Sequence, residues 1–180
     1  MAQIKLQADG LNLADTFAFT GTITGAGGGK ILQVVGSSSN FGASTTSNSY
    51  VDVTSATGVA WEVALTPSAT DSKILVVGHF TCQGYLSSSE DGRGCFQLMA
   101  KDGDGAYAEV FDAMSQIGGY TYDAGGSWIG DTHAVTWLHA PSSTNAITFK
   151  LQARNVQGST VIEWSNNSSA SHMTLMEVGA

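Results

Sequence analysis

The chain has 180 residues, of which 42% are hydrophobic and only 12% are charged, and its formal net charge is −8 at pH 7. This length suits one domain with an additional segment, and the hydrophobic share is enough for a packed core. With 7 Lys plus Arg against 15 Asp plus Glu, a basic surface that could neutralise a run of phosphates is excluded. We therefore expect no binding to nucleic acid.

The N-terminal sequence bears on where the protein is made. Residues 1–9 lack the apolar run and the cleavage site of a signal peptide, and no segment is long and apolar enough to cross a bilayer. We expect no membrane insertion, synthesis in a cytoplasm, and exit only by another route such as cell lysis.

A glycine-rich run at residues 25–29, with the sequence GAGGG, divides the chain. Such a run is a flexible joint, so we expect an extended arm at 1–29 and a head domain at 30–180. Large apolar residues alternate with small or polar ones in the arm: Leu11, Leu13, Phe17 and Phe19. An arm this short cannot bury its own apolar face. Either it binds a partner, or it adds a strand to the head.

After the joint, short apolar runs alternate with turns rich in Gly, Ser, Asn and Asp. The runs lie at residues 30–35, 50–53, 59–65, 74–85, 95–100, 107–111, 132–140, 146–153, 161–164 and 173–178. Serial short strands of this kind predict an all-β fold, a sandwich or jelly roll. The one helical feature that we expect is a single turn at residues 112–116.

Four segments, in the right order, resemble one protein family. They are LNLADTFAFTG at 11–21, GKILQVV at 29–35, LTPSATDSKILV at 65–76 and TLMEV at 174–178. Together they resemble the leader, the first strand, a turn with its strand and the last strand of β domains in virion and tail-fibre-like proteins. These proteins belong to tailed bacteriophages, especially those of aquatic bacteria. The interior at 87–130 matches no part of this pattern.

The resemblance implies a structural protein of the virion. Because no catalytic arrangement stands out in the sequence, we expect neither a cofactor nor enzymatic activity, and we expect synthesis in the host cytoplasm. It implies a tail-fibre or receptor-binding-type protein; the alternative is a capsid decoration or head-fibre protein. A glycan depolymerase is the less favoured third reading. The expected partners are other tail or capsid proteins and a host cell-surface glycan or protein. The resemblance also implies a homotrimer with a jelly-roll-like head.

Two groups of residues are candidates for contacts with partners. We expect the arm residues Leu11, Leu13, Phe17 and Phe19 to attach the chain to the particle. Aromatic residues among glycines and hydroxyls at 118–128 suit stacking on a sugar or another protein: Tyr120, Tyr122 and Trp128. The alternative for this second group is that Trp128 and one tyrosine cap the end of the sandwich.

The only two cysteines, Cys82 and Cys95, flank a predicted hairpin tip. If the turn centres near residue 88 or 89, they lie opposite each other and could form a disulfide. The alternative, two small buried side chains, suits a protein that folds in a reducing cytoplasm.

Metal and catalytic sites are not expected. The DGDG sequence at 102–105 resembles the start of a calcium loop, but the later ligands are missing and Asp-Gly favours a tight turn. His133 and His139 share one strand face at too great a separation for one ion, and His79 and His172 are isolated in the sequence. Carboxylates such as Asp52 and Glu62 show no pattern that marks them for acid–base chemistry.

Overall fold

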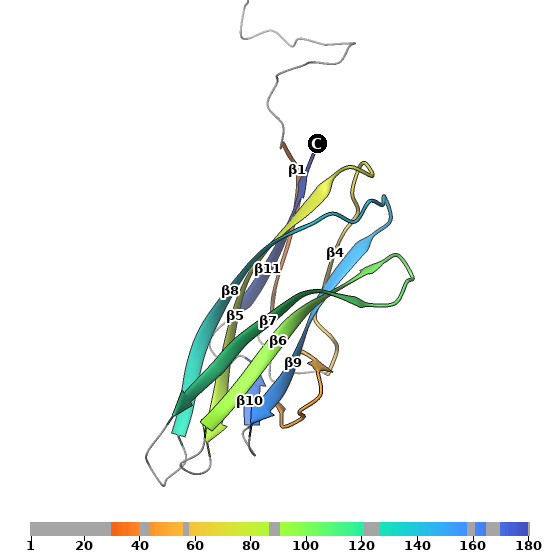
Figure 1. Ribbon diagram of the computed structural model, residues 1–180. Helices are drawn as coiled ribbons and strands as arrows, with labels where there is room; N and C mark the ends of the chain where they lie inside the picture. The colour runs from red at the N-terminus through yellow and green to blue at the C-terminus, as the bar shows by residue number, and fades with distance from the viewer. Residues whose placement is uncertain are drawn as a thin grey trace, which may run out of the picture.

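The computed structural model describes residues 30–39, 44–55, 58–86, 91–120, 127–157, 161–164 and 170–179. All regular secondary structure in these ranges is β (Figure 1). The strands are β1 (Ile31–Ser39), β2 (Ser44–Thr45), β3 (Val51–Asp52), β4 (Glu62–Leu65), β5 (Lys73–Leu86), β6 (Asp91–Asp102), β7 (Ala108–Tyr120), β8 (Ser127–His139), β9 (Ile147–Gln157), β10 (Val161–Trp164) and β11 (Ser171–Val178). No helix capable of spanning a membrane occurs in this described part of the chain.

The strands form two antiparallel sheets. The six-stranded sheet has the order β1-β11-β5-β10-β2, and β8 pairs with β5 as well. The five-stranded sheet has the order β3-β9-β6-β7, and β4 pairs with β9 as well. The two sheets pack face to face and enclose one hydrophobic core, which confirms the predicted sandwich.

The pairing of eight of the described strands is nested along the chain. β6 pairs with β7, β5 with β8, β4 with β9 and β1 with β11. Each outer pair encloses the inner ones in sequence, as in a long hairpin wrapped into two layers, which is a jelly-roll-like arrangement. The first and last strands are therefore neighbours, with Val35 opposite Leu175.

The predicted helical turn at residues 112–116 is wrong. These residues lie inside β7, where Asp112 pairs with Gln97 and Ala113 pairs with Phe96 of β6. Strand pairing on both sides of this stretch, from Asp112 and Ala113 and again from Ile117, overrides a weak local preference.

Alternate residues of the strands build the core. In β4 the burial alternates strictly, and Val63 and Leu65 are buried while Glu62 and Ala64 are exposed. The largest fully buried side chains come from both sheets: Phe80, Phe96, Phe149, Leu65, Ile74, Leu98, Ile147, Leu151, Met173 and Leu175. Burying each such side chain contributes about 1.5–3 kcal/mol, so this layer is the main source of stability.

Candidate functional site

A buried carboxylate joins three distant segments at one end of the sandwich. Glu177 of β11 is fully buried, and its Oε1 accepts hydrogen bonds from the backbone N–H of Ser68 (2.7 Å) and from the Ser68 hydroxyl (2.6 Å). Its Oε2 accepts a bond from Nε2 of Gln33 in β1 (2.6 Å). The same Gln33 amide donates to the carbonyl oxygen of Thr66 (2.6 Å). We call these residues the Glu177 network.

Neutral hydrogen-bond donors, and no cation among these contacts, stabilise the negative charge of the Glu177 carboxylate. Burial alone raises the pKa of Glu177, but the hydrogen bonds from Ser68 and Gln33 outweigh it and lower the pKa to about 2. Glu177 is therefore ionised at neutral pH, and the donors fix it in one geometry. This arrangement suits a structural clamp.

The members of the network come from three of the segments that carry the family resemblance. Gln33 belongs to the GKILQVV segment, Thr66 and Ser68 to the LTPSATDSKILV segment, and Glu177 to the TLMEV segment. Residues 144 positions apart in the sequence thus share one hydrogen-bond network. The polar residues of these motifs join the first strand, the turn between β4 and β5 and the last strand.

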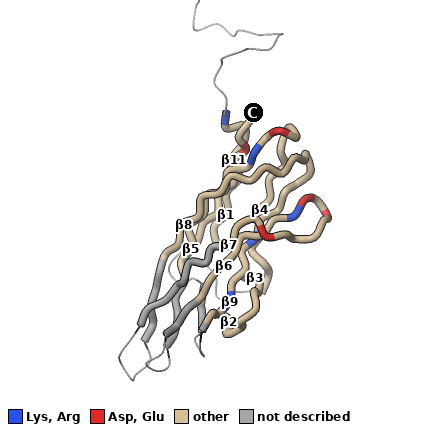
Figure 2. The backbone as a smooth tube through the Cα atoms, in the orientation of Figure 1, with Lys and Arg blue, Asp and Glu red and all other residues tan. Residues whose placement is uncertain are grey.

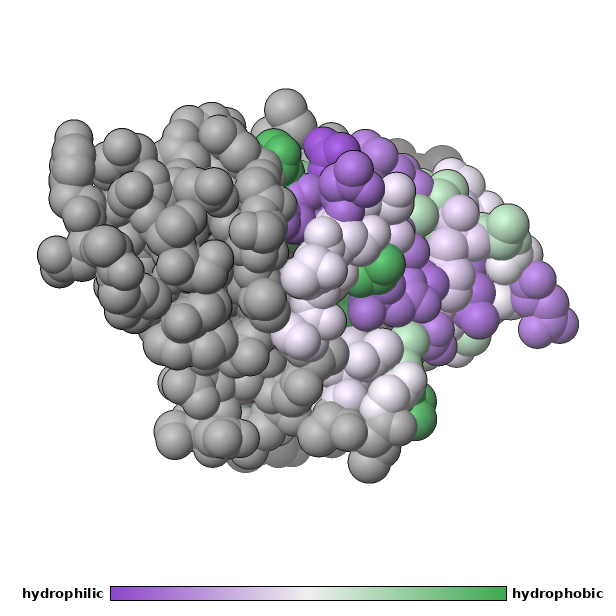
Figure 3. All heavy atoms as spheres, turned by 90° about the horizontal axis from the view of Figure 1, so that it is seen from below, coloured by the Kyte–Doolittle hydropathy of each residue, from purple (hydrophilic) through white to green (hydrophobic). Residues whose placement is uncertain are grey.

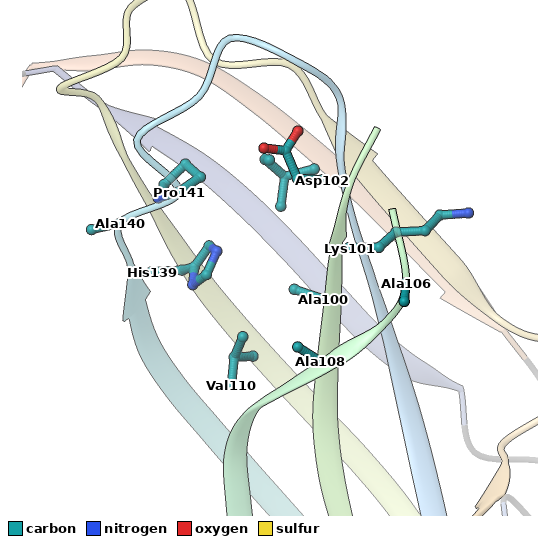
Figure 4. Close-up of a pocket in the computed structure, with 10 residues that line it drawn as sticks. Ala100, Lys101, Asp102, Ala106, Ala108, Val110, His139, Ala140 and Pro141 are labelled. Carbon is teal, nitrogen blue, oxygen red and sulfur yellow. The ribbon is translucent and has the colours of Figure 1, made fainter. Parts of the chain in front are cut away.

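A pocket of about 260 Å³ opens between the end of β8 and the strands β6 and β7 (Figure 4). Its lining is mainly apolar and small, and it consists of Ala100, Lys101, Asp102, Ala106, Ala108, Val110, His139, Ala140, Pro141 and Ile147. His139 points from β8 into the space bordered by Ala100 and Val110.

The chemistry of this pocket is modest. Burial lowers the pKa of His139, so its imidazole is neutral at pH 7 and offers one hydrogen-bond donor and one acceptor. The ring also packs edge-on against Phe149, with centroids 5.5 Å apart. Asp102 at the rim accepts a hydrogen bond from the Ser143 hydroxyl (3.1 Å). The space suits a small apolar group with one polar atom.

The outer face of the six-stranded sheet carries almost no charge. Three rows of facing residues cross β1, β11, β5 and β8: Val34, Met176, Leu75 and Leu138; Gly36, Thr174, Val77 and Thr136; Ser38, His172, His79 and Ala134. In the first row, Val34 is 58% exposed and Leu138 is 49% exposed. Figure 2 shows no charged residue in the middle of these strands where they are described. We call this surface the uncharged face.

The outer face of the five-stranded sheet is polar instead. The Nζ of Lys150 lies 2.7 Å from Oδ1 and 2.8 Å from Oδ2 of Asp52, and Gln152 donates to the same carboxylate (2.8 Å). Burial raises the pKa of Asp52, but the bonds from Lys150 and Gln152 outweigh it and lower the pKa. Tyr107 donates to Glu62 (2.6 Å), and its ring lies 4.1 Å from the Lys150 ammonium. Both carboxylates therefore have structural partners.

Figure 3 shows the molecule from below the orientation of Figure 1. In the coloured part of that view, which is the part of the chain that the structure describes, hydrophobic side chains lie singly among hydrophilic ones. The described atoms in this view therefore form no continuous hydrophobic patch.

The cysteines do not flank a hairpin. β5 and β6 follow each other in the chain but belong to different sheets, so the predicted opposition of Cys82 and Cys95 is wrong. Cys95 is a free, buried cysteine that accepts a hydrogen bond from Nε of Arg154 (3.2 Å) and lies 3.4 Å from the Tyr50 hydroxyl. The side chain of Cys82 lies outside the described residues.

The expected contact residues are largely beyond what the structure describes. Leu11, Leu13, Phe17 and Phe19 of the arm and Tyr122 lie outside the described residues. For the other two aromatic candidates only the backbone is described: Tyr120 pairs with Asp91, and Trp128 pairs with Tyr85. The attachment and ligand roles therefore stay predictions.

The DGDG turn and the histidines had mixed outcomes. β6 ends at Asp102, Gly103 has a φ of 53°, and the N–H of Gly105 donates to the carbonyl of Asp102 (2.9 Å), so the predicted turn is confirmed. His133 and His139 share the inner face of β8, as predicted, since their rings pack against the core residues Phe96 and Phe149. His79 and His172, which are isolated in the sequence, are directly opposite each other in the β5–β11 ladder.

No group of three or more His, Cys, Asp or Glu side chains within the described ranges could share a metal ion. No protein-family model and no curated protein sequence matches the chain.

Proposed function

We propose that this chain is a non-enzymatic structural component of a tailed-phage virion, most concretely a tail-fibre or receptor-binding-type protein. The observation that supports this most is the Glu177 network. Three segments that resemble phage virion β domains contribute its hydrogen-bonding residues. Residues of these separate motifs therefore belong to one hydrogen-bond network.

The layout of the head supports an arm that anchors and a head that faces outward. β1 begins at Ile31, next to the end of β11, and Figure 1 shows this end of the sandwich opposite the end where β7 stops and β8 starts. In the proposal, residues 1–29 attach through Leu11, Leu13, Phe17 and Phe19, and Tyr120, Tyr122 and Trp128 face the host surface. The functional unit is a homotrimer.

Copy number in the particle tests this proposal and separates it from its alternative. Quantitative mass spectrometry of purified virions should find a handful of trimers if the chain belongs to the tail. Hundreds of copies would indicate a capsid decoration or head-fibre protein. Absence of the chain from purified virions would refute both.

Removing the residues before Gly25 tests the role of the arm. The truncated chain should remain folded by circular dichroism but should no longer join the particle. A matched control replaces Leu11, Leu13, Phe17 and Phe19 by serine in the full-length chain, which keeps the length of the arm. If the serine variant assembles like the wild type, or if the truncated head does not fold, the attachment role is wrong.

A glycan depolymerase remains the third reading, and one assay distinguishes it. The purified chain should bind host cells without releasing reducing sugars from their surface glycans. Release of reducing sugars at a rate that scales with protein concentration would replace the structural proposal by the enzymatic one.

A further inference from the structure

Two histidines meet on the uncharged face. His79 of β5 and His172 of β11 are directly opposite each other, and both are exposed. Their ring centroids are 6.2 Å apart, and the ring planes are inclined by 38°. The residues next to them in the row are small, Ser38 on β1 and Ala134 on β8, so neither covers the imidazoles.

The separation of the rings suits a shared ion. A zinc ion lies about 2.0–2.1 Å from an imidazole nitrogen, so two rings can bind one ion when their centroids are up to about 6.4 Å apart. The observed 6.2 Å lies inside this limit. Small χ rotations, which are open to exposed side chains, would bring the rings to the roughly 5 Å expected for tetrahedral coordination.

The surroundings determine which ions fit. The neighbouring row consists of Gly36, Thr174, Val77 and Thr136, so no carboxylate from these described positions takes part. A site with two imidazoles and water as ligands favours Zn²⁺, Ni²⁺ or Cu²⁺ over Mg²⁺ and Ca²⁺, which require oxygen ligands. The net charge of −8 raises the local concentration of any cation.

We propose that His79 and His172 bind one divalent transition-metal ion of the zinc, nickel and copper class on the uncharged face. This site is independent of the proposed virion role. Because the β5–β11 ladder brings the two histidines together only in the folded sheet, binding also stabilises the fold.

The experiment uses the full-length chain without a polyhistidine tag. Isothermal titration with NiCl₂ and ZnCl₂ at pH 7.5 should show one ion per chain, whereas MgCl₂ should give no comparable signal. His79→Asn and His172→Asn should each weaken binding at least tenfold. Thr136→Asn, on the same exposed face, should bind like the wild type.

A second readout separates metal binding from any effect on folding. In EDTA, the melting temperatures of the histidine variants should lie within a few degrees of that of the wild type. When NiCl₂ is added, the melting temperature should rise only for the wild type and the Thr136→Asn variant. The proposal is overturned if a variant that carries both His79→Asn and His172→Asn binds Ni²⁺ like the wild type, or if the wild type binds Ni²⁺ no better than Mg²⁺.

Discussion

Ser68 donates both its backbone N–H and its hydroxyl to the same carboxylate oxygen of Glu177, at 2.7 and 2.6 Å. The two residues are 109 positions apart, so this contact ties the turn between β4 and β5 to the last strand. Gln33 adds the first strand through the other oxygen. The Glu177 network therefore links the first strand, the turn after β4 and the last strand of the sandwich.

Glu177→Gln should lower the free energy of unfolding by about 2–3 kcal/mol, because the charged acceptor is lost and an amide N–H₂ faces the Gln33 amide. Ser68→Ala removes only the hydroxyl bond and should lower it by about 1–2 kcal/mol. Urea denaturation followed by tryptophan fluorescence measures both. Glu109→Gln, at an exposed position on β7, is the control and should change stability by less than about 0.5 kcal/mol.

Acid should destabilise the protein through the same carboxylate. The pKa of Glu177 is about 2 in the folded chain against an ordinary 4.5, so the folded state binds the proton more weakly. Its stabilising contribution is complete above pH 4.5 and is lost as the pH falls towards 2. Urea denaturation at pH values from 6 to 2 should show a shallower decline for Glu177→Gln than for the wild type. Parallel declines would mean that Glu177 is not the group that titrates.

Gly78 on β5 should tolerate no side chain. A Cβ built at this position would lie 2.3 Å from Cζ of Phe80, whose ring is buried in the core above the glycine. Gly78→Ala would displace this ring and should cost about 1–3 kcal/mol. At Gly36 on β1 the nearest atom to such a Cβ is Oγ1 of Thr174 at 3.7 Å, so Gly36→Ala should be neutral or stabilising. Thermal unfolding of both variants checks the contrast, and equal shifts would contradict it.

The ion pair of Lys150 and Asp52 should behave as a unit. Lys150 is only 8% exposed, so Asp52→Asn leaves a nearly buried ammonium without its anion and should cost about 1–2 kcal/mol. Adding Lys150→Met to that variant removes the unpaired charge and should recover much of the loss. A double-mutant cycle by urea denaturation measures the coupling. Additive effects of the two substitutions would show that the pair is not coupled.

Cys95 should be protected from alkylation in the folded protein. Its side chain is 1% exposed, so iodoacetamide should modify it only after unfolding in guanidinium chloride. Peptide mass spectrometry without reductant should recover it as a free thiol. A peptide linked to Cys82 would contradict the free cysteine, and rapid labelling of native protein would contradict its burial.

The sequence by itself was sufficient for the fold class and for the central part of most strands, because a β-strand is a local pattern. It missed β2, the start of β6 and β8 and the second half of β7. In β4, for example, the buried Val63 and Leu65 alternate with exposed neighbours. Such alternation predicts which side chains face the core. The sequence also predicted the turn at residues 102–105, because Asp-Gly pairs favour the backbone conformation of a tight turn. The same local reasoning failed at residues 112–116, which lie within β7 between residues that pair with β6.

Partners distant in sequence could be found only in the tertiary structure. The sequence between Cys82 and Cys95 does not show that β5 and β6 belong to different sheets. The loop of a hairpin and a connection from one sheet to the other can have similar residues. Likewise, His79 and His172 become neighbours only through the β5–β11 ladder. Strand order depends on the packing of the whole core. The contact between Ser68 and Glu177 and the pairing of His79 with His172 depend on that strand order.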